Sequence, residues 1–473
     1  MSDAGYWRLS AVELLAGYER REFSPVEVTR ELLERAERLN PQLSAFLAIN
    51  TDDALAAAQR AEDAWRASGE RGLLCGVPVS VKDSIEVAGM PTTYGSLAFR
   101  DNRQPDAELV RRLRREGAVI TGKTNLPEFA LHAGVDNRIS PHGRNPWNLA
   151  HTCGGSSGGA GSSVAAGIGP IGIGTDSGGS IRMPSALNGI YGIKPTYQRI
   201  PAVQTWRAAP GRSHNGPMTR TVRDSALLLQ AIGGYDPRDP ESRHHPTDYM
   251  AFDQGDLRGL RVAVSYDFGK GFPMDAEALA LVREAAALLE SMGCQVRESH
   301  PPTMDEPEEL EPGVWAYAGD HFAAAEAMLP NFLENHADEL GPHARPIYEK
   351  GPVAKAWQSR RIVRRNRAYG AAVQEWFRDH DLLLCPTMGP AQTVEQAAEV
   401  RQRSGPPQSF NVPFNHAYNP AAAVPFGFHT NGLPLAVQLV GRLGDDVGVL
   451  RASAAIEAAR PWGHRWPVLA EQA

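Results

Sequence analysis

The chain has 473 residues, of which 42% are hydrophobic and 22% charged, proportions typical of a globular protein. These proportions exclude wholesale disorder. The formal net charge of −7 argues against a nucleic-acid partner, because such binding depends on clustered lysine and arginine. Glycine is unevenly distributed, since 13 of the 46 glycines lie between Gly154 and Gly192.

The N-terminus and the cysteines indicate the compartment. No basic segment followed by a long apolar one opens the chain, so we expect no signal peptide. The most apolar stretch, 164–175, is too short to span a membrane and is interrupted by Pro170. The cysteines form no CxxC pair, which is typical of reduced thiols, and Cys153 is expected to be a small packed residue. We therefore expect a cytoplasmic protein with no membrane partner.

Helical and strand patterns alternate along the first part of the chain. A capping box at Ser24 to Glu27, with proline at the first helical position, predicts a helix from residue 25, and an alanine-rich helix is predicted over 52–65. Alternating valines predict a strand that ends near Lys82. A helix over 106–116 and a short buried strand over 118–122 follow. This alternation favours a parallel or mixed sheet.

The rest of the chain continues the pattern. The glycine-rich segment contains a predicted strand over 168–175 and a turn that enters a helix near Ile181. Further elements are expected in chain order: a helix over 221–234, a strand over 259–265, a helix over 274–292, strands at 382–384, 422–424 and 435–439, and a last helix ending at 459. Residues 303–313 are predicted to form a loop and 315–380 helices. We expect one α/β domain over 1–473, with a large mixed sheet flanked by helices and a helical, cap-like subregion at about 303–380.

Three other patterns carry no assigned chemistry. The glycines of 167–172 match the spacing of a dinucleotide site, but this segment runs into a strand instead of from a strand into a helix. His244 and His245 have no partners at metal-ligand spacing and are expected on the surface. The arginines of 360–367 are expected on a solvated or ion-paired helix face. The sequence therefore predicts neither a cofactor nor a metal site.

The strongest chemical pattern joins two serines and a lysine. Ser156 stands in Gly-Gly-Ser-Ser-Gly-Gly, and Ser180 follows 24 residues later at a second glycine turn. Such a turn places a serine hydroxyl beside backbone N–H groups that can bind an oxyanion, here those of Ser177, Gly178, Gly179 and Ser180. Serine is a weak nucleophile that needs a base, and lysine is a base only where burial keeps it neutral. Lys82, after an apolar strand, fits that need.

These residues stand within a longer set of matches that resembles the amidase signature family. The matches include Pro-Val-Ser-Val-Lys-Asp at 78–83, Gly-Lys-Thr-Asn at 122–125, Asn-Pro-Trp at 145–147 and Gly-Ile-Lys-Pro-Thr at 192–196. They resume at 414–415, 419–421, 424–425, 432–434 and 438–441. The resemblance covers nearly the whole chain and implies the amidase signature fold.

The resemblance also implies a mechanism. Ser180 would be the nucleophile, Ser156 a bridging serine after a cis peptide, and Lys82 the base. The expected reaction is cleavage of the C–N bond of an amide, anilide or carbamate through a Ser180 acyl-enzyme, with ester hydrolysis as a further activity. The acyl side is expected to be lined by Phe129, Ala130 and Leu131.

Aromatic residues elsewhere are open to two interpretations. Tyr418 stands where glycine is common in the family, and it either narrows the substrate site or packs as a local variation. Trp315, Tyr317 and Phe322 of the helical subregion either cover the pocket or pack in its core.

The main alternative is the A subunit of a glutamine-dependent transfer-RNA amidotransferase, which works in a complex. Its site must pair the ammonium group of glutamine with a carboxylate. No Asp or Glu occurs between Glu399 and Asp445, where the similar protein has an acidic residue. The sequence therefore favours a neutral or apolar small-molecule substrate and a monomer or homodimer. An inactive binding module is disfavoured because all three triad positions are filled.

Overall fold

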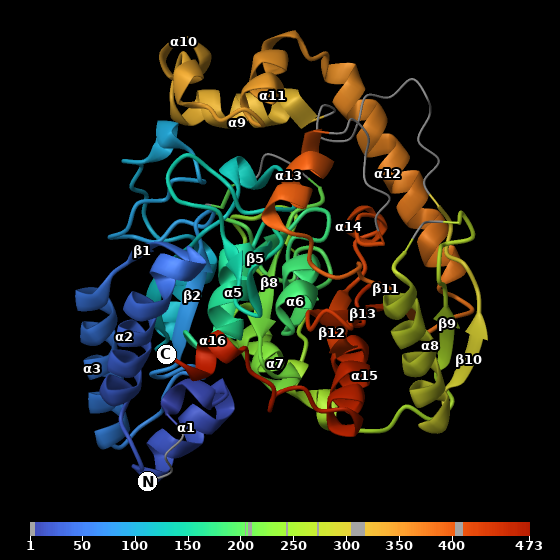
Figure 1. Cartoon of the computed structure of the whole chain (residues 1–473), viewed down its shortest axis with the longest axis horizontal. Helices are drawn as coiled ribbons and strands as arrows, with labels where there is room; N and C mark the ends of the chain where they lie inside the picture. The colour runs from blue at the N-terminus through green and yellow to red at the C-terminus, as the bar shows by residue number, and fades with distance from the viewer. Residues whose placement is uncertain are drawn as a thin grey trace.

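An 11-stranded mixed sheet forms the centre of the computed structural model, which describes residues 5–203, 205–206, 211–242, 245–271, 274–303, 317–402 and 410–473 (Figure 1). Its strand order is β1-β3-β2-β6-β8-β7-β12-β13-β11-β9-β10. The strands are β1 (Phe46–Ile49), β2 (Pro78–Lys82), β3 (Val119–Thr124), β6 (Ile171–Asp176), β7 (Tyr191–Lys194), β8 (His214–Thr219), β9 (Arg261–Val264), β10 (Gln295–Glu298), β11 (Leu382–Pro386), β12 (Ala421–Phe428) and β13 (Pro434–Gly441). A separate hairpin pairs β4 (Arg144–Asn145) with β5 (Asn148–Thr152).

The centre of the sheet places the site. Strand β2 runs parallel to both β3 and β6, so β2 and β6 end at the same edge. Strand β8 runs antiparallel to β6, with His214 opposite Asp176. Side chains on a strand alternate between its faces, and Ile171 and Ile173 accordingly belong to the main hydrophobic core. The prediction of a large mixed sheet is confirmed.

The described helices outside the 317–380 region are α1 (Ala11–Arg20), α2 (Pro25–Leu43), α3 (Thr51–Arg66), α4 (Glu108–Arg115), α5 (Gly158–Ala165), α6 (Arg182–Asn188), α7 (Val222–Ile232), α8 (Ala276–Ser291), α13 (Val394–Gln402), α14 (Pro413–His416), α15 (Asp446–Ala459) and α16 (Val468–Glu471). The capping box is confirmed, because Ser24 Oγ accepts from Glu27 N–H and the Glu27 carboxylate accepts from Ser24 N–H. No helix among the described residues has the length and apolar character needed to cross a membrane.

The sequence did not predict helix α5, nor the short helices α13, α14 and α16. Helix α5 is built from glycine, serine and alanine, with one valine, and the glycines have a low helix propensity. All eight of its residues are buried, and Ala160 and Val164 pack with Ile181 and Met218 in one hydrophobic cluster. Tertiary packing of small side chains therefore overrides local propensity at this helix.

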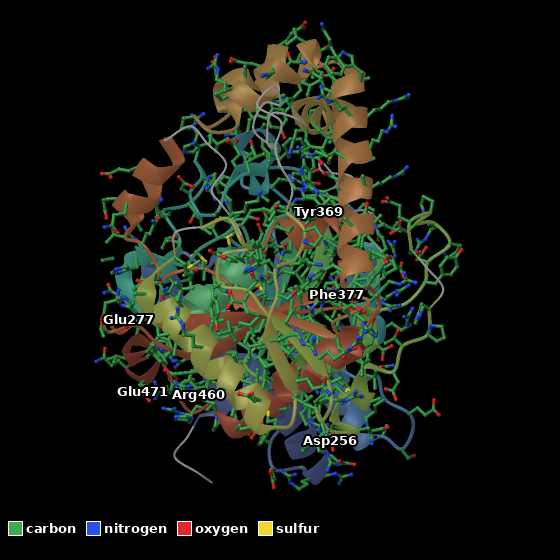
Figure 2. All side chains as sticks on the ribbon, turned by 90° about the vertical axis from the view of Figure 1, so that its right-hand side faces the viewer. Asp256, Glu277, Tyr369, Phe377, Arg460 and Glu471 are labelled. Carbon is green, nitrogen blue, oxygen red and sulfur yellow. The ribbon has the colours of Figure 1, made fainter. Side chains whose placement is uncertain are left out.

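The helical subregion begins at the top of Figure 1 and extends through α12 down its right-hand side. It contains α9 (Ala318–Met328), α10 (Phe332–His336), α11 (Arg345–Lys350) and α12 (Ala356–Trp376). Phe332 and Tyr348 pack in one cluster with Phe99 and Phe129. Further along, Tyr369 of α12 and the nearby Phe377 lie on the side of the molecule shown in Figure 2, where they join a second cluster with Phe414. The helices expected within 315–380 are thus present, whereas the expected loop at 303–313 lies almost wholly outside the described residues.

Candidate active site

Lys82 ends β2 and is fully buried. Its Nζ donates to Ser156 Oγ at 2.7 Å, Ser157 Oγ at 3.0 Å and Thr175 Oγ1 at 2.8 Å. Within the described part of the chain no carboxylate forms an ion pair with this amine. Burial lowers the pKa of Lys82 to about 7, and the charge of Asp176 only partly opposes that effect. Near neutral pH a large fraction of Lys82 is therefore uncharged and can accept a proton.

The loop that carries Ser156 is held from both sides. The Gly155–Ser156 peptide is cis. A Cβ atom at Gly155 would lie 2.4 Å from Gly134 O, so only glycine fits there. Ser157 Oγ donates to Thr175 O at 3.1 Å and accepts from Thr175 N–H at 3.1 Å, which attaches the loop to β6.

Ser180 lies between the end of β6 and the start of α6 and is half-buried. Ser157 N–H donates to Ser180 O at 3.2 Å, so the two serine loops are adjacent. The neighbouring Gly179 has a φ of 118°, and a Cβ atom there would lie 2.7 Å from Asn411 Cβ. Over the described ranges, Ser180 Oγ has no side-chain hydrogen bond, so the structure joins Lys82 to Ser156 directly and brings Ser180 beside them through the backbone.

The expected oxyanion donors are not equivalent. Gly179 N–H donates to Asp176 Oδ1 at 2.7 Å, so this expected donor already has a partner. The N–H groups of Ser177, Gly178 and Ser180 donate to no other described residue. The carboxylate of Asp176 therefore shapes the turn, and three N–H groups are left to bind an oxyanion.

Asp176 is held in turn by Arg182, and both side chains are fully buried. Arg182 donates to both carboxylate oxygens at 3.0 Å, and Asn415 Nδ2 donates to Oδ1 at 2.8 Å. Burial raises the pKa of Asp176, but Arg182 outweighs that effect and holds the pKa well below its ordinary range. The sequence pattern did not single out this pair.

A cavity of about 70 Å³ adjoins the nucleophile loop. Its lining includes Thr175 and Ser177, the predicted residues Phe129, Ala130 and Leu131, and five others: Ser84, Trp206, Arg212, Ser213 and His321. The rings of Phe129 and Trp206 stack with centroids 5.4 Å apart. The three residues predicted to line the acyl side thus lie at a cavity beside the candidate oxyanion site.

The other predicted aromatic residues pack. Tyr418 stacks on Tyr197 with centroids 4.7 Å apart and is not among the described residues that line this cavity. Its φ of 66° lies in the left-handed region, where glycine is least strained. Tyr317 is 2% exposed, and Phe322 packs against Gly351. Trp315 lies outside the described residues.

The remaining sequence features stay apart from this site. Cys153 is fully buried, and burial raises the pKa of its thiol to about 12, in keeping with a packed residue. His245 is exposed, whereas His244 lies outside the described residues. Of the arginines in 360–367, only Arg365 is partly buried and the others are exposed.

One cluster has the composition of a metal site. Side-chain ligand atoms of His132, Asp136 and His343 lie within 4.8 Å of one another. Both ring nitrogens of His132 are already engaged, because Nδ1 accepts from Gly134 N–H at 3.2 Å and Nε2 lies 2.8 Å from Asp136 Oδ1. A metal ion bound by His132 Nε2 and Asp136 would have to replace the proton that these two groups share.

Comparisons with known proteins extend over the whole chain. A family model described as Amidase matches residues 27–450. An acylamidase of Rhodococcus erythropolis is 35% identical over 98% of this chain and 97% of its own length. The A subunit of the glutamyl-tRNA(Gln) amidotransferase of a Roseiflexus species is 36% identical over 95% and 96%. Among solved structures, a bacterial aryl acylamidase described as an amidase signature enzyme superposes with a TM-score of 0.88 at 28% identity, covering 98% of each chain.

Proposed function

The chain belongs to the amidase signature family of amidohydrolases, and on that premise we propose that it is a serine hydrolase with Ser180 as nucleophile. The proposed reaction transfers the acyl group of an amide, anilide or carbamate first to Ser180 and then to water. The observation that carries the proposal is the 2.7 Å contact between Lys82 Nζ and Ser156 Oγ, made by a lysine whose pKa burial lowers to about 7.

The hydrogen bonds around Lys82 support one proton arrangement. Ser157 donates its hydroxyl proton to Thr175 O, so its oxygen accepts from Lys82. Thr175 Oγ1 can accept a second amine proton. A neutral amine has two protons and one lone pair, and the lone pair is then left for the hydroxyl proton of Ser156.

The acylation step follows from this arrangement. Lys82 takes the proton of Ser156, Ser156 takes the proton of Ser180, and Ser180 Oγ forms a bond to the substrate carbonyl carbon. The carbonyl oxygen gains negative charge, which the N–H groups of Ser177, Gly178 and Ser180 stabilise. Ser180 Oγ must turn toward Ser156 for this transfer.

The second half returns the proton. As the tetrahedral intermediate collapses, the C–N bond breaks, and the proton held by Lys82 passes through Ser156 to the leaving nitrogen. The acyl group is then an ester of Ser180. Water attacks this ester, gives its proton to the same pair, and releases the acid while Ser180 regains its hydrogen.

The cavity and the sequence support the substrate class. Phe129 and Trp206 provide an aromatic wall beside Ser177. No acidic residue occurs between Glu399 and Asp445 to pair with the ammonium group of glutamine. We therefore place an acyl amide, anilide or carbamate with an apolar or aromatic part ahead of glutamine. The second candidate is the A subunit of an amidotransferase, which the likeness to the Roseiflexus protein favours.

A hydrolysis screen tests the proposal. The purified chain should be assayed with a primary amide, an anilide, a carbamate, an ester and glutamine. We expect anilide or carbamate turnover to exceed glutamine turnover. Glutamine hydrolysis that appears only with a partner protein would support the second candidate instead.

Active-site labelling identifies the nucleophile. A fluorophosphonate probe should label the wild type, and Ser180→Ala should lose both labelling and at least about 10⁴-fold in kcat/KM. Ser291→Ala, which changes an exposed serine of α8, is the control and should be labelled normally. Continued labelling of Ser180→Ala would show that another residue is the nucleophile.

A further inference from the structure

Arg212 brings a positive charge to the cavity beside the nucleophile loop. It lies two residues before His214, which pairs with Asp176 across the sheet. Its carbonyl oxygen accepts from His214 Nδ1 at 2.8 Å and from Asn415 Nδ2 at 3.4 Å. Both of these donors also bond Asp176, so the backbone of Arg212 is fixed to the base of the Ser180 turn.

The guanidinium group is not matched by an acid. In the part of the chain that the structure describes, it forms no ion pair and donates no hydrogen bond, and its Nε atom is buried without a partner. Its side-chain contact is with the ring of Tyr317, whose centroid lies 4.5 Å from Cζ. Arginine stays protonated in proteins, so this charge is not removed by titration.

Three more polar atoms of the same cavity are buried without a hydrogen-bond partner among the described residues. They are Ser84 Oγ, Trp206 Nε1 and His321 Nδ1. Ser84 and His321 are 4% and 7% exposed, so bulk water does not satisfy them. Burial, assisted by Arg212, lowers the pKa of His321 to about 3, so this imidazole adds no charge. Of these groups, the indole N–H and the guanidinium can only donate.

This combination is unusual in a protein interior. Buried polar groups are nearly always hydrogen-bonded, and a buried charge is nearly always paired. Three buried polar atoms and a half-buried arginine, whose Nε is buried without a partner, line one cavity of about 70 Å³ and point to a ligand that supplies acceptors. An anionic group of the ligand would form an ion pair with the guanidinium group of Arg212, and its oxygens can also accept hydrogen bonds from the indole and hydroxyl groups.

We propose that this cavity is an anion subsite and that the substrate carries a carboxylate, bound by Arg212, in addition to its scissile C–N bond. The inference rests on the proposed function and deepens it, because it names the polar part of the substrate. The aromatic wall of Phe129 and Trp206 accommodates the apolar atoms between the two groups. This inference replaces the neutral substrate expected from the sequence with an amide or anilide that has one negative charge.

A single negative charge also separates this substrate from glutamine. Glutamine would offer Arg212 a carboxylate, but its ammonium group would face Arg212 and the neutral His321 in a cavity whose lining contains no Asp or Glu among the described residues. The subsite therefore favours a monoanion over a zwitterion.

Matched substrates test the proposal. The para-nitroanilide of succinic acid is compared with its uncharged isostere, in which an isopropyl group replaces the carboxylate. A second pair, para-acetamidobenzoate and para-isopropylacetanilide, places the charge on the amine side. In the wild type we expect kcat/KM to favour the charged member of at least one pair by about 10- to 100-fold, the value of a charged hydrogen bond.

Variants then assign the preference. In Arg212→Gln the ratio should fall to about one or below, whereas Arg212→Lys should keep part of it. Arg361→Gln, which changes an exposed arginine of α12, should keep the full ratio. Fluorophosphonate labelling of Ser180 in each variant verifies that the site has folded. If Arg212→Gln does not fold, protection of the wild type from labelling by succinanilate, compared with its isopropyl isostere, tests the same subsite.

The outcomes separate the two proposals. Hydrolysis of the uncharged members without any preference for charge, or a preference that persists in Arg212→Gln, overturns the anion subsite and leaves the hydrolase intact. Absence of hydrolysis and of Ser180 labelling overturns the proposed function itself. Higher turnover of glutamine than of either charged anilide would also overturn the anion subsite as described.

Discussion

Two arginines near the Ser180 turn have opposite surroundings. Arg182 donates to both oxygens of Asp176 and also to Asn411 O and Gln438 Oε1. Arg212, which lines the cavity, has no acceptor within the described ranges and an unpartnered buried Nε. One charge is fully compensated by the protein, and the other is not.

The difference indicates a structural role for Arg182 and a ligand-binding role for Arg212. In a buried ion pair with complete hydrogen bonding, the interactions within the protein offset the free-energy cost of removing both charges from water, and the pair holds the local backbone in place. A half-buried cation without an acid, such as Arg212, can still attract an anionic ligand. Lys82 lies between these cases, because three hydroxyl groups bond its amine without neutralising its charge.

The largest effect on stability is expected at the compensated arginine. Arg182→Met leaves the buried carboxylate of Asp176 without its cation and should lower the free energy of unfolding by about 3–5 kcal/mol. Urea denaturation measures the change. Arg360→Met, on the exposed face of α12, is the control and should stay within about 0.5 kcal/mol of the wild type. Equal stability of Arg182→Met and wild type would remove the distinction between the two arginines.

The sign of the pH dependence at this pair follows from Asp176. Its pKa is lower in the folded state than its ordinary value of 3.8. The stabilisation is therefore present above about pH 4 and is lost as the pH falls below that value. Acid unfolding should show this loss in the wild type and a weaker loss in Arg182→Met.

Replacing Lys82 is expected to affect both catalysis and the pH dependence of stability. Lys82→Met should lower kcat/KM by about 10²–10⁴-fold, because the proton acceptor is removed. The free energy of unfolding of Lys82→Met, relative to that of the wild type, should be highest at or below pH 7. The folded pKa near 7, against 10.5 for the free amine, means that the wild type gains stability as the pH rises between these values. Denaturation at several pH values measures this slope, which the methionine variant should lack.

A second buried lysine provides the matched control. Lys123 is also fully buried, but it pairs with Asp83 at 2.9 Å. Lys123→Met should lose about 3–5 kcal/mol, because it leaves Asp83 buried and unpaired. If Lys82→Met and Lys123→Met changed the free energy of unfolding by the same amount, the ion pair with Asp83 would not explain a difference between the two lysines.

The pH dependence of catalysis adds an independent measurement at Lys82. Because the neutral amine is the base, kcat/KM of the wild type should fall as the pH drops below the pKa near 7, approaching about tenfold per pH unit. The rate profile of a para-nitroanilide checks this limb. An unchanged rate through that range would contradict the assignment of Lys82 as the base.

The smallest effect on stability is expected at the uncompensated arginine. Arg212→Met removes a desolvated charge without breaking an ion pair, so the free energy of unfolding should stay unchanged or rise by about 1 kcal/mol. Thermal and urea denaturation measure it beside Arg182→Met. A loss of more than about 2 kcal/mol would mean that Arg212 has a structural partner, which would contradict the contrast between the two arginines.

The sequence predicted the regular elements where apolar periodicity is strong. The valine strand that ends at Lys82, the capped helix after Ser24 and the strands near 382, 422 and 435 all occur close to their expected positions. Helix α5 was missed because its glycines indicate a loop, and strand β8 because His214–Thr219 has no apolar alternation. In both elements burial against neighbours supplies the stabilisation that local pattern lacks.

At the site, sequence reasoning reached the residues whose type alone suggests chemistry. Ser156, Ser180 and Lys82 were named from glycine turns and a buried strand end, and their roles came from a family resemblance. For Tyr418 the sequence left open whether it contacts the substrate or packs, because only the structure shows that it occupies a left-handed backbone position and stacks on Tyr197. The hydrogen bond from Gly179 N–H to Asp176 could not be predicted from the sequence either.

The sequence by itself determined the sheet-and-helix composition, the family and the reactive residue types, because these depend on short-range pattern and on motifs. Only the tertiary structure decided which charges are compensated. Asp176 and Arg182 are six residues apart, but Gln438 and Asn415, which complete their bonding, are more than 200 residues away. Arg212 gives no signal in its own segment, and its significance arises because folding brings it, half-buried, to the cavity that Ser177 also lines, with no acid paired to it among the described residues.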